Sequence, residues 1–209
     1  MEYQLETDKA TRNVTKKLHD REYEFQGLHQ RKKKRKEIDL KNKVYVAPLT
    51  TVGNLPFRRV LVGFGCDVTC GEMALAYQIV RGSPSEWALL KRHSSEKTFG
   101  VQIAGCNVAE MANAAELISK ECPDVDFVDL NMGCPIDDVT KHGGGSAIMN
   151  RTARVEQIVS TIVKTAPDIA LGLKMRTGWS DEPKVAHKII QSLQPHATSL
   201  VYVTVHGRS

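Results

Sequence analysis

The chain has 209 residues, of which 41% are hydrophobic and 25% charged, and a formal net charge of +5. These values suit one soluble domain with a sizeable core, and no apolar run approaches the roughly 18 residues that a membrane-spanning helix needs. Five unevenly spaced cysteines and a polar amino terminus argue against a secreted disulfide scaffold. We therefore expect an intracellular protein, cytoplasmic or nuclear.

Residues 1–43 are predicted to form a basic, polar leader that is helical or flexible. They hold 13 Lys and Arg against 8 Asp and Glu, whereas residues 44–209 hold 16 of each. The positive charge is concentrated in R-K-K-K-R-K at 31–36. Such a run can neutralise nucleic-acid phosphates, serve as a nuclear-import patch or simply be solvated, and the sequence leaves these interpretations open.

From residue 44 onward, short apolar strands alternate with helices. The predicted strands cover residues 44–47, 67–70, 99–103, 127–130, 170–174 and 200–205. The clearest predicted helices cover residues 55–63, 108–121, 155–165 and 184–193. Strands that are apolar almost throughout are typical of parallel strands buried on both faces.

This repeat fits either a doubly wound sheet or a (β/α)8 TIM barrel. No G-x-G-x-x-G follows the first predicted strand, which argues against a dinucleotide-binding sheet. Polar residues instead recur where strands end, at Gln102, Asn131, Lys174 and His206, as they do around a barrel mouth. We therefore predict an α/β TIM barrel over residues 44–209. A complete barrel takes about 250 residues, so we expect one that is truncated after about six strands.

The most informative segment is D-L-N-M-G-C-P at 129–135, which places Cys134 just past the end of a buried strand. The carboxyl ends of parallel strands are where ligands and catalytic groups collect. A thiol there can act as an acid, because its ordinary pKa of about 8.5 leaves it mostly protonated at neutral pH. The alternative is a small buried apolar residue, which is how we interpret the other four cysteines. Cys66 and Cys70 are too isolated to suggest zinc, and no metal site is predicted.

Eight motifs together resemble the dihydrouridine synthase family, the flavin enzymes that reduce uridine in tRNA. They are A-P-L-T at 47–50, L-P-F-R-R at 55–59, Glu72-Met73, V-Q-I-A-G at 101–105, D-L-N-M-G-C-P at 129–135, K-H-G-G-G-S-A-I-M at 141–149, L-K-M-R-T-G-W at 173–179 and V-H-G-R at 205–208. The motifs occur in the family's order over about 80% of the chain. The first motifs and the basic leader most resemble the eukaryotic members that act at position 47 of tRNA.

The resemblance implies FMN-dependent reduction of uridine to 5,6-dihydrouridine in tRNA, with NADPH reducing the flavin. Reduced flavin would give a hydride to C6 of uracil while Cys134 protonates C5. The resemblance assigns the flavin contacts to Pro48, Leu49, Thr50, Gln102, Lys174 and His206. Asn131 is expected to orient the uracil or the flavin. RNA contacts are expected from Lys141, Arg176 and Arg208. Whether mRNA is also a substrate, and which oligomeric state the protein adopts, the sequence leaves open.

Plainer interpretations exist for most of these residues. Lys174 could form an ion pair with Glu72 or Asp129, the loop at 48–50 could be an ordinary connection, and Lys141 could begin a helix. The two arginines could be merely solvated. At the level of the whole chain, the alternatives are another flavin barrel that reduces a small pyrimidine or enone, or a truncated, non-catalytic fragment that binds RNA or a partner.

Overall fold

Five parallel strands form the sheet of this protein in the computed structural model, which describes residues 2–27, 37–180 and 183–208. The strands lie in chain order, and each neighbouring pair is parallel. They are β1 Val68–Leu75, β2 Thr98–Ala104, β3 Phe127–Met132, β4 Ala170–Arg176 and β5 Leu200–His206. This topology is that of consecutive βα units, and it brings all the C-terminal strand ends to one edge. The basic run R-K-K-K-R-K at 31–36, whose role the sequence leaves open, lies outside the described residues.

Helices connect the strands and cover the sheet. They are α1 Glu2–His19, α2 Leu55–Gly63, α3 Ala76–Val80, α4 Pro84–Leu89, α5 Val108–Glu121, α6 Asp137–Thr140, α7 Thr152–Thr165 and α8 Ala186–Ser192, with the 3₁₀ helices η1 Gly145–Asn150 and η2 Gln194–Ser199. The predicted helices at 55–63 and 108–121 are confirmed as α2 and α5. Each begins at an asparagine, Asn54 or Asn107, whose side-chain oxygen accepts a backbone N–H of the first turn at 3.1 Å and 2.9 Å.

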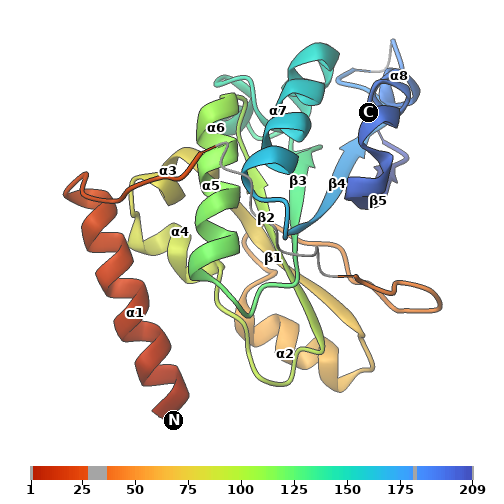
Figure 1. Ribbon diagram of the computed structural model, residues 1–209. Helices are drawn as coiled ribbons and strands as arrows, with labels where there is room; N and C mark the ends of the chain where they lie inside the picture. The colour runs from red at the N-terminus through yellow and green to blue at the C-terminus, as the bar shows by residue number, and fades with distance from the viewer. Residues whose placement is uncertain (1, 28–36, 181–182, 209) are drawn as a thin grey trace.

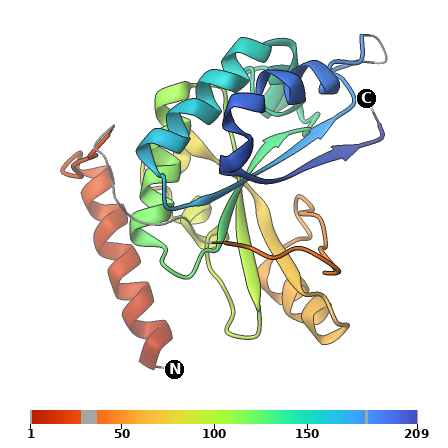
Figure 2. The ribbon, with the colours of Figure 1, turned by 45° about the vertical axis from the view of Figure 1, so that its right-hand side comes forward.

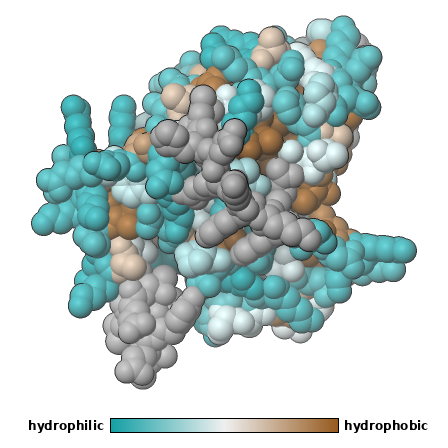
Figure 3. Space-filling model, in the orientation of Figure 1, coloured by the Kyte–Doolittle hydropathy of each residue, from teal (hydrophilic) through white to brown (hydrophobic). Residues whose placement is uncertain are grey.

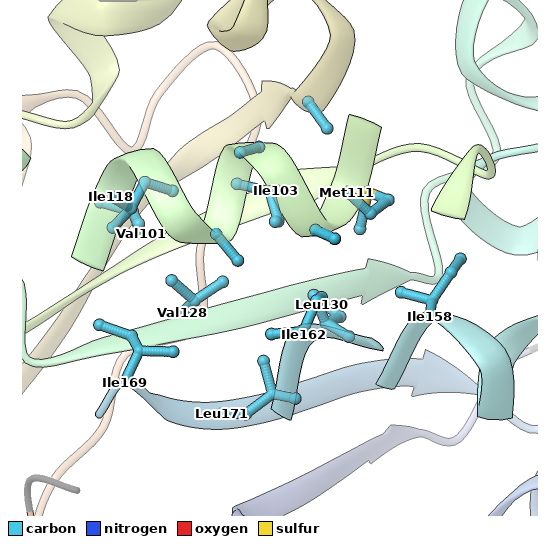
Figure 4. Close-up of a cluster of buried hydrophobic side chains, with 14 of the residues drawn as sticks. Val101, Ile103, Met111, Ile118, Val128, Leu130, Ile158, Ile162, Ile169 and Leu171 are labelled. Atoms are coloured by element: carbon cyan, nitrogen blue, oxygen red, sulfur yellow. The ribbon is translucent and has the colours of Figure 1, made fainter. Parts of the chain in front are cut away.

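The main hydrophobic core lies between α5, α7 and one face of the sheet (Figures 1 and 2). Figure 4 shows alternate residues of neighbouring strands on this face, with Val101 and Ile103 of β2 beside Val128 and Leu130 of β3. These side chains are at most 1% exposed. Because strand side chains alternate between faces, the residues between them must point to the opposite side of the sheet.

The opposite face carries an aromatic cluster near the start of the strands. The rings of Tyr45, Phe127 and Tyr202 meet edge to face, with centroids 5.6 to 6.1 Å apart. Two strand glycines make room for them, because a Cβ on Gly100 would collide with Phe127 and one on Gly172 with Tyr202. The aromatic cluster therefore fills this face of the sheet near the N-terminal ends of the strands, away from the edge that their C-terminal ends form.

The prediction of a strand over residues 44–47 is wrong, because this segment forms a single bridge and not a strand. Tyr45 forms only an isolated parallel bridge with Val68 at the start of β1. Two backbone hydrogen bonds support this bridge: the N–H of Val46 donates to the carbonyl of Val68 at 3.2 Å, and the N–H of Val68 donates to the carbonyl of Val44 at 3.1 Å. Pro48 follows, and because it has no N–H it cannot donate to a continued ladder. The sheet in the described part of the chain thus has five strands instead of the six predicted, and β1 runs further than expected, to Leu75.

The leader is fastened to the rest of the protein by α5. Glu116 is fully buried, and its two carboxylate oxygens accept the backbone N–H groups of Gln26 at 2.7 Å and Gly27 at 3.1 Å. Tyr23 OH donates to Glu121 at 2.7 Å, and Leu18 of α1 is buried in the main core. The predicted helical state is present in α1, whereas a separate leader domain ending at residue 43 stays a prediction.

The predicted fold class is confirmed: the sheet is that of an incomplete TIM barrel, and it is open between β5 and β1 within the described ranges. The first five residues of β5 are half-buried, and Val205 and His206 at its end are exposed. In Figure 3 hydrophobic residues reach the surface on the right-hand side, where Figure 1 places β4 and β5. Within the described chain, no helix is both long and apolar enough to cross a membrane.

Candidate active site

Three predicted site residues come together on neighbouring strands. Gln102 of β2, Asn131 of β3 and Lys174 of β4 all lie on the sheet face opposite the helices, near the C-terminal strand ends. Asn131 is in direct register with Lys174, and Gln102 is in register with Asp129, two residues before Asn131. The side-chain amides of Gln102 and Asn131 are joined by a hydrogen bond of 2.8 Å.

Cys134 is held in a fixed turn directly after β3. Its backbone N–H donates to Asn131 Oδ1 at 2.9 Å, and the N–H of Gly133 donates to the same oxygen at 3.1 Å. The carbonyl of Cys134 accepts from the backbone N–H and the hydroxyl of Ser146, at 2.8 and 3.0 Å. A side chain at Gly145 would collide with this carbonyl, and Gly145 has a φ of +55°. The glycine at 145 is therefore required by both space and backbone conformation.

The side chain of Cys134 sits in a small apolar cluster. It packs with Ala104 at the end of β2 and with Val139 of α6, and Met73 and Leu75 of β1 lie against the same cluster. Cys134 is 8% exposed, so a small part of the residue remains accessible to solvent. The thiol is thus held at the strand-end edge, shielded from bulk water.

Asp129 is a buried carboxylate that the sequence suggested only as an ion-pair partner of Lys174. Its two oxygens accept from Gln102 Nε2 at 2.6 Å and from Tyr202 OH at 2.9 Å. Burial raises the pKa of Asp129 from 3.8 to about 6, against the opposing effects of these two bonds and of the nearby Lys174 charge. The signal that could have found it is its spacing from Asn131, because residues i and i+2 of a strand share a face.

Lys174 is half-buried and has no acidic side chain within 4 Å of its Nζ among the described residues. The predicted alternative of a direct ion pair with Glu72 or Asp129 is therefore not formed. Glu72 instead accepts the backbone N–H of Thr51 at 2.6 Å. A half-buried ammonium without a close counter-charge suits a ligand that carries negative charge at this position.

The loop of Pro48, Leu49 and Thr50 lies beside β1, where Glu72 fixes it through Thr51. Thr51 adopts a φ of +67°, and Leu49 is 52% exposed. The carbonyl of Leu49 accepts the N–H of Gly53 at 2.7 Å, which closes a tight turn. The loop therefore contains a tight turn that is held to β1, and both its predicted flavin contacts and the alternative of an ordinary connection stay untested.

The remaining predicted residues lie at the rim. Arg176 Nε donates to the carbonyl of Gly133 at 2.6 Å, so this arginine holds the turn that carries Cys134. His206 is exposed at the end of β5, opposite Arg176 in register, and its Nδ1 accepts the backbone N–H of Arg208 at 3.2 Å. Lys141 is exposed after α6 and lies 3.5 Å from Asp137. Their roles towards flavin or RNA stay predictions.

The donor set fits the polar edge of a flavin ring. The amide nitrogens of Gln102 and Asn131 each use one N–H within the protein, which leaves each a second N–H, and Lys174 adds a cation. Amide donors and a cation are groups that a ring of carbonyl and imine acceptors would satisfy.

A groove of about 500 Å³ lies elsewhere, between α1, α4 and the turn after α5. It is lined in part by His93 and Asp124, which precede β2 and β3 and so belong to the opposite edge of the sheet. No predicted site residue lines it. We place the candidate site at the strand ends because the convergent polar groups lie there.

Comparison with known proteins identifies the family of the chain. Residues 45–209 match the family described as Dihydrouridine synthase (Dus). The chain is 53% identical over 175 residues to a Xenopus tropicalis protein named tRNA-dihydrouridine(47) synthase (NAD(P)+)-like, and 49% identical over 175 residues to the human protein of that name. It is 46% identical over 176 residues to a tRNA-dihydrouridine(47) synthase (NAD(P)+) of Coprinopsis cinerea. These matches cover 84% of this chain but 26 to 27% of the relatives, so the chain spans about a quarter of their length.

Proposed function

Because the chain belongs to the dihydrouridine synthase family, we propose that it carries the proton-donor site for reduction of uridine to 5,6-dihydrouridine in tRNA. The observation that supports this most is the position of Cys134, in a fixed turn beside Gln102, Asn131 and Lys174. The names of the relatives specify position 47 of tRNA. Since the chain spans about a quarter of these relatives, the activity, its substrate and that position are all part of the proposal.

We propose FMN as the cofactor and NADPH as the reductant that recharges it. Reduced FMN, when bound, supplies the hydride for C6 of the uracil ring. The residues proposed to hold it are Pro48, Leu49, Thr50, Gln102, Lys174 and His206. The Lys174 ammonium would offset negative charge on the ring, because no acidic group of the described residues neutralises it within 4 Å. Gln102 and Asn131 would orient the ring or the uracil with their remaining N–H groups.

Cys134 would supply the proton for C5. Its S–H bond breaks as the new C5–H bond forms, and the thiolate left behind takes a proton from water to complete the cycle. The bonds to Asn131 and Ser146 hold the backbone of this residue in place, which would limit the freedom lost when the thiol is positioned against a bound uracil. The low exposure of Cys134 limits wasteful reaction of the thiol with solutes.

The rim would meet the RNA. A uridine in folded tRNA must leave its stack to reach the strand ends, so phosphates must approach the exposed rim. Lys141 and Arg208 are exposed there and are the candidates for phosphate contacts. Arg176 combines such a contact with its bond to Gly133.

The test is dihydrouridine formation in tRNA by the protein and its Cys134→Ala variant, measured by nucleoside mass spectrometry. We expect the variant to lose at least about a hundredfold in rate, the lower range for removal of a general acid, while keeping its flavin spectrum. The matched control is Cys106→Ala, because Cys106 also follows a strand end but donates only to the carbonyl of His142. Equal rates for Cys134→Ala and the parent would remove the proton-donor assignment.

Parallel assays separate the alternatives. A flavin barrel for small pyrimidines or enones would reduce free uracil or an enone without RNA. A non-catalytic fragment would bind tRNA in a gel-shift assay without forming dihydrouridine, and the half-buried edge strand β5 is the observation that favours this possibility.

A further inference from the structure

A line of hydrogen bonds connects the backbone of Cys134 to the buried carboxylate of Asp129. The N–H of Cys134 donates to Asn131 Oδ1, Asn131 Nδ2 donates to Gln102 Oε1, and Gln102 Nε2 donates to Asp129 Oδ2. The three distances are 2.9, 2.8 and 2.6 Å. Every donor in the line points away from Cys134 and towards Asp129.

The direction of each bond is forced by its neighbours. Backbone N–H groups can only donate, so the two that meet Asn131, from Gly133 and Cys134, require the amide oxygen there. The amide nitrogen of Asn131 must then face Gln102, which has to present its oxygen. The nitrogen of Gln102 in turn must face an acceptor at position 129, and an ionised carboxylate is a pure acceptor.

Asp129 is built to be that acceptor. It is fully buried; Gln102 from β2 and Tyr202 from β5 donate to it, and the Lys174 charge from β4 acts on it at longer range. Cys70 of β1 and Tyr45 also lie near enough for the Asp129 charge to raise their pKa values. Burial raises the pKa values of Tyr202 and Tyr45 well above their usual range, so both phenols keep their protons. Tyr202 therefore donates to Oδ1 of Asp129, which leaves Oδ2 to accept from Gln102.

We propose that Asp129 is a positioning residue, which acts through Gln102 and Asn131 to fix the turn that carries Cys134. The same line also fixes the amide orientations of Gln102 and Asn131, and so decides which of their atoms face the proposed cofactor or uracil. This consequence for the reaction rests on the proposed function, whereas the ordering of the turn does not.

The experiment measures amide hydrogen exchange of Gly133 and Cys134 by NMR in the 209-residue chain, without flavin or RNA. We expect Asp129→Leu and Gln102→Met to speed exchange at both amides by about tenfold, the size of one ordinary hydrogen bond. Asp129→Asn should rescue protection, because its amide oxygen can accept from Gln102 while its nitrogen donates to the Tyr202 hydroxyl. The rate at Val128, in the middle of the sheet, serves as the reference for global opening.

The matched control is Tyr202→Phe, which removes the other bond to Asp129 but leaves the line to Cys134 intact. In this variant we expect the amide exchange rate of Cys134 to change only by the same factor as the rate of Val128. Unchanged protection of Gly133 and Cys134 in both Asp129→Leu and Gln102→Met would overturn the proposal, as would equal acceleration in Tyr202→Phe. The proposed function is tested separately by Cys134→Ala, so failure of one leaves the other standing.

Discussion

Replacing Asp129 by asparagine removes a buried charge while keeping the shape of the side chain and an acceptor for Gln102. The pKa of Asp129 is raised from 3.8 to about 6 in the folded protein. A difference of about two pKa units corresponds to an unfavourable contribution of about 3 kcal/mol when the group is ionised in both states. At about pH 7.5 we therefore expect Asp129→Asn to have a larger free energy of unfolding than the parent, by up to this amount.

The pH dependence follows from the raised folded-state pKa. Below the unfolded pKa of 3.8 the carboxyl is protonated in both states and no penalty exists. As the pH rises, the unfolded chain releases the proton first, so the folded state loses stability until the pH passes about 6. At about pH 5 roughly half of the penalty remains, and the advantage of Asp129→Asn should be about half of its value at pH 7.5.

The assay is urea unfolding of both proteins at these two pH values, followed by far-UV circular dichroism. The control is Asp126→Asn, which removes a carboxylate that accepts the N–H of Phe99 at 2.9 Å and lies 3.2 Å from Arg92. This control should gain no stability at either pH. An Asp129→Asn variant that is less stable than the parent at about pH 7.5, or whose stability advantage does not change with pH, would show that the Asp129 charge does not destabilise the fold.

Two further predictions concern packing around the site and the leader. Gly145→Ala should lower the free energy of unfolding by about 2 to 3 kcal/mol, because the added methyl group would collide with the carbonyl of Cys134 and the residue has a positive φ. The control is Gly63→Ala, whose methyl group would have no neighbour within 4 Å, and urea unfolding should detect no loss of stability in it. Glu116→Ala leaves two backbone N–H groups of residues 20–27 without their carboxylate, so limited trypsin digestion should release the leader faster. Digestion of Glu116→Ala at the parental rate would contradict that docking role.

The arrangement of the site was largely predictable because it follows from strand periodicity. Gln102, Asn131 and Lys174 each end an apolar run, and parallel strands in chain order bring such ends to one edge. The strand at 44–47 was overestimated, since four apolar residues before a proline fit a strand but support only one bridge here. Local pattern cannot show how far a ladder continues, because pairing depends on the neighbouring strand.

Two contacts could not be predicted from the sequence, because the residues that make them are distant along the chain. Asp129 meets Tyr202, 73 residues later, and only the observed register brings them together. Glu116 precedes Lys120 by four residues, a spacing typical of an exposed helix pair. It is nevertheless fully buried, because it satisfies backbone N–H groups about 90 residues away. The sequence pattern of a helix shows which residues share a face, but it does not show which distant segment packs against that face.

FMN titration shows whether the strand-end residues hold a flavin next to Cys134. Binding to the 209-residue chain would be followed by quenching of FMN fluorescence, in parallel with Lys174→Ala and with Lys164→Ala, an exposed lysine of α7, as the control. We expect saturable binding that Lys174→Ala weakens by about tenfold or more, the loss of one charge-assisted contact, while Lys164→Ala matches the parent. Equal affinity of the parent and both variants, or no saturable binding at all, would contradict this expectation.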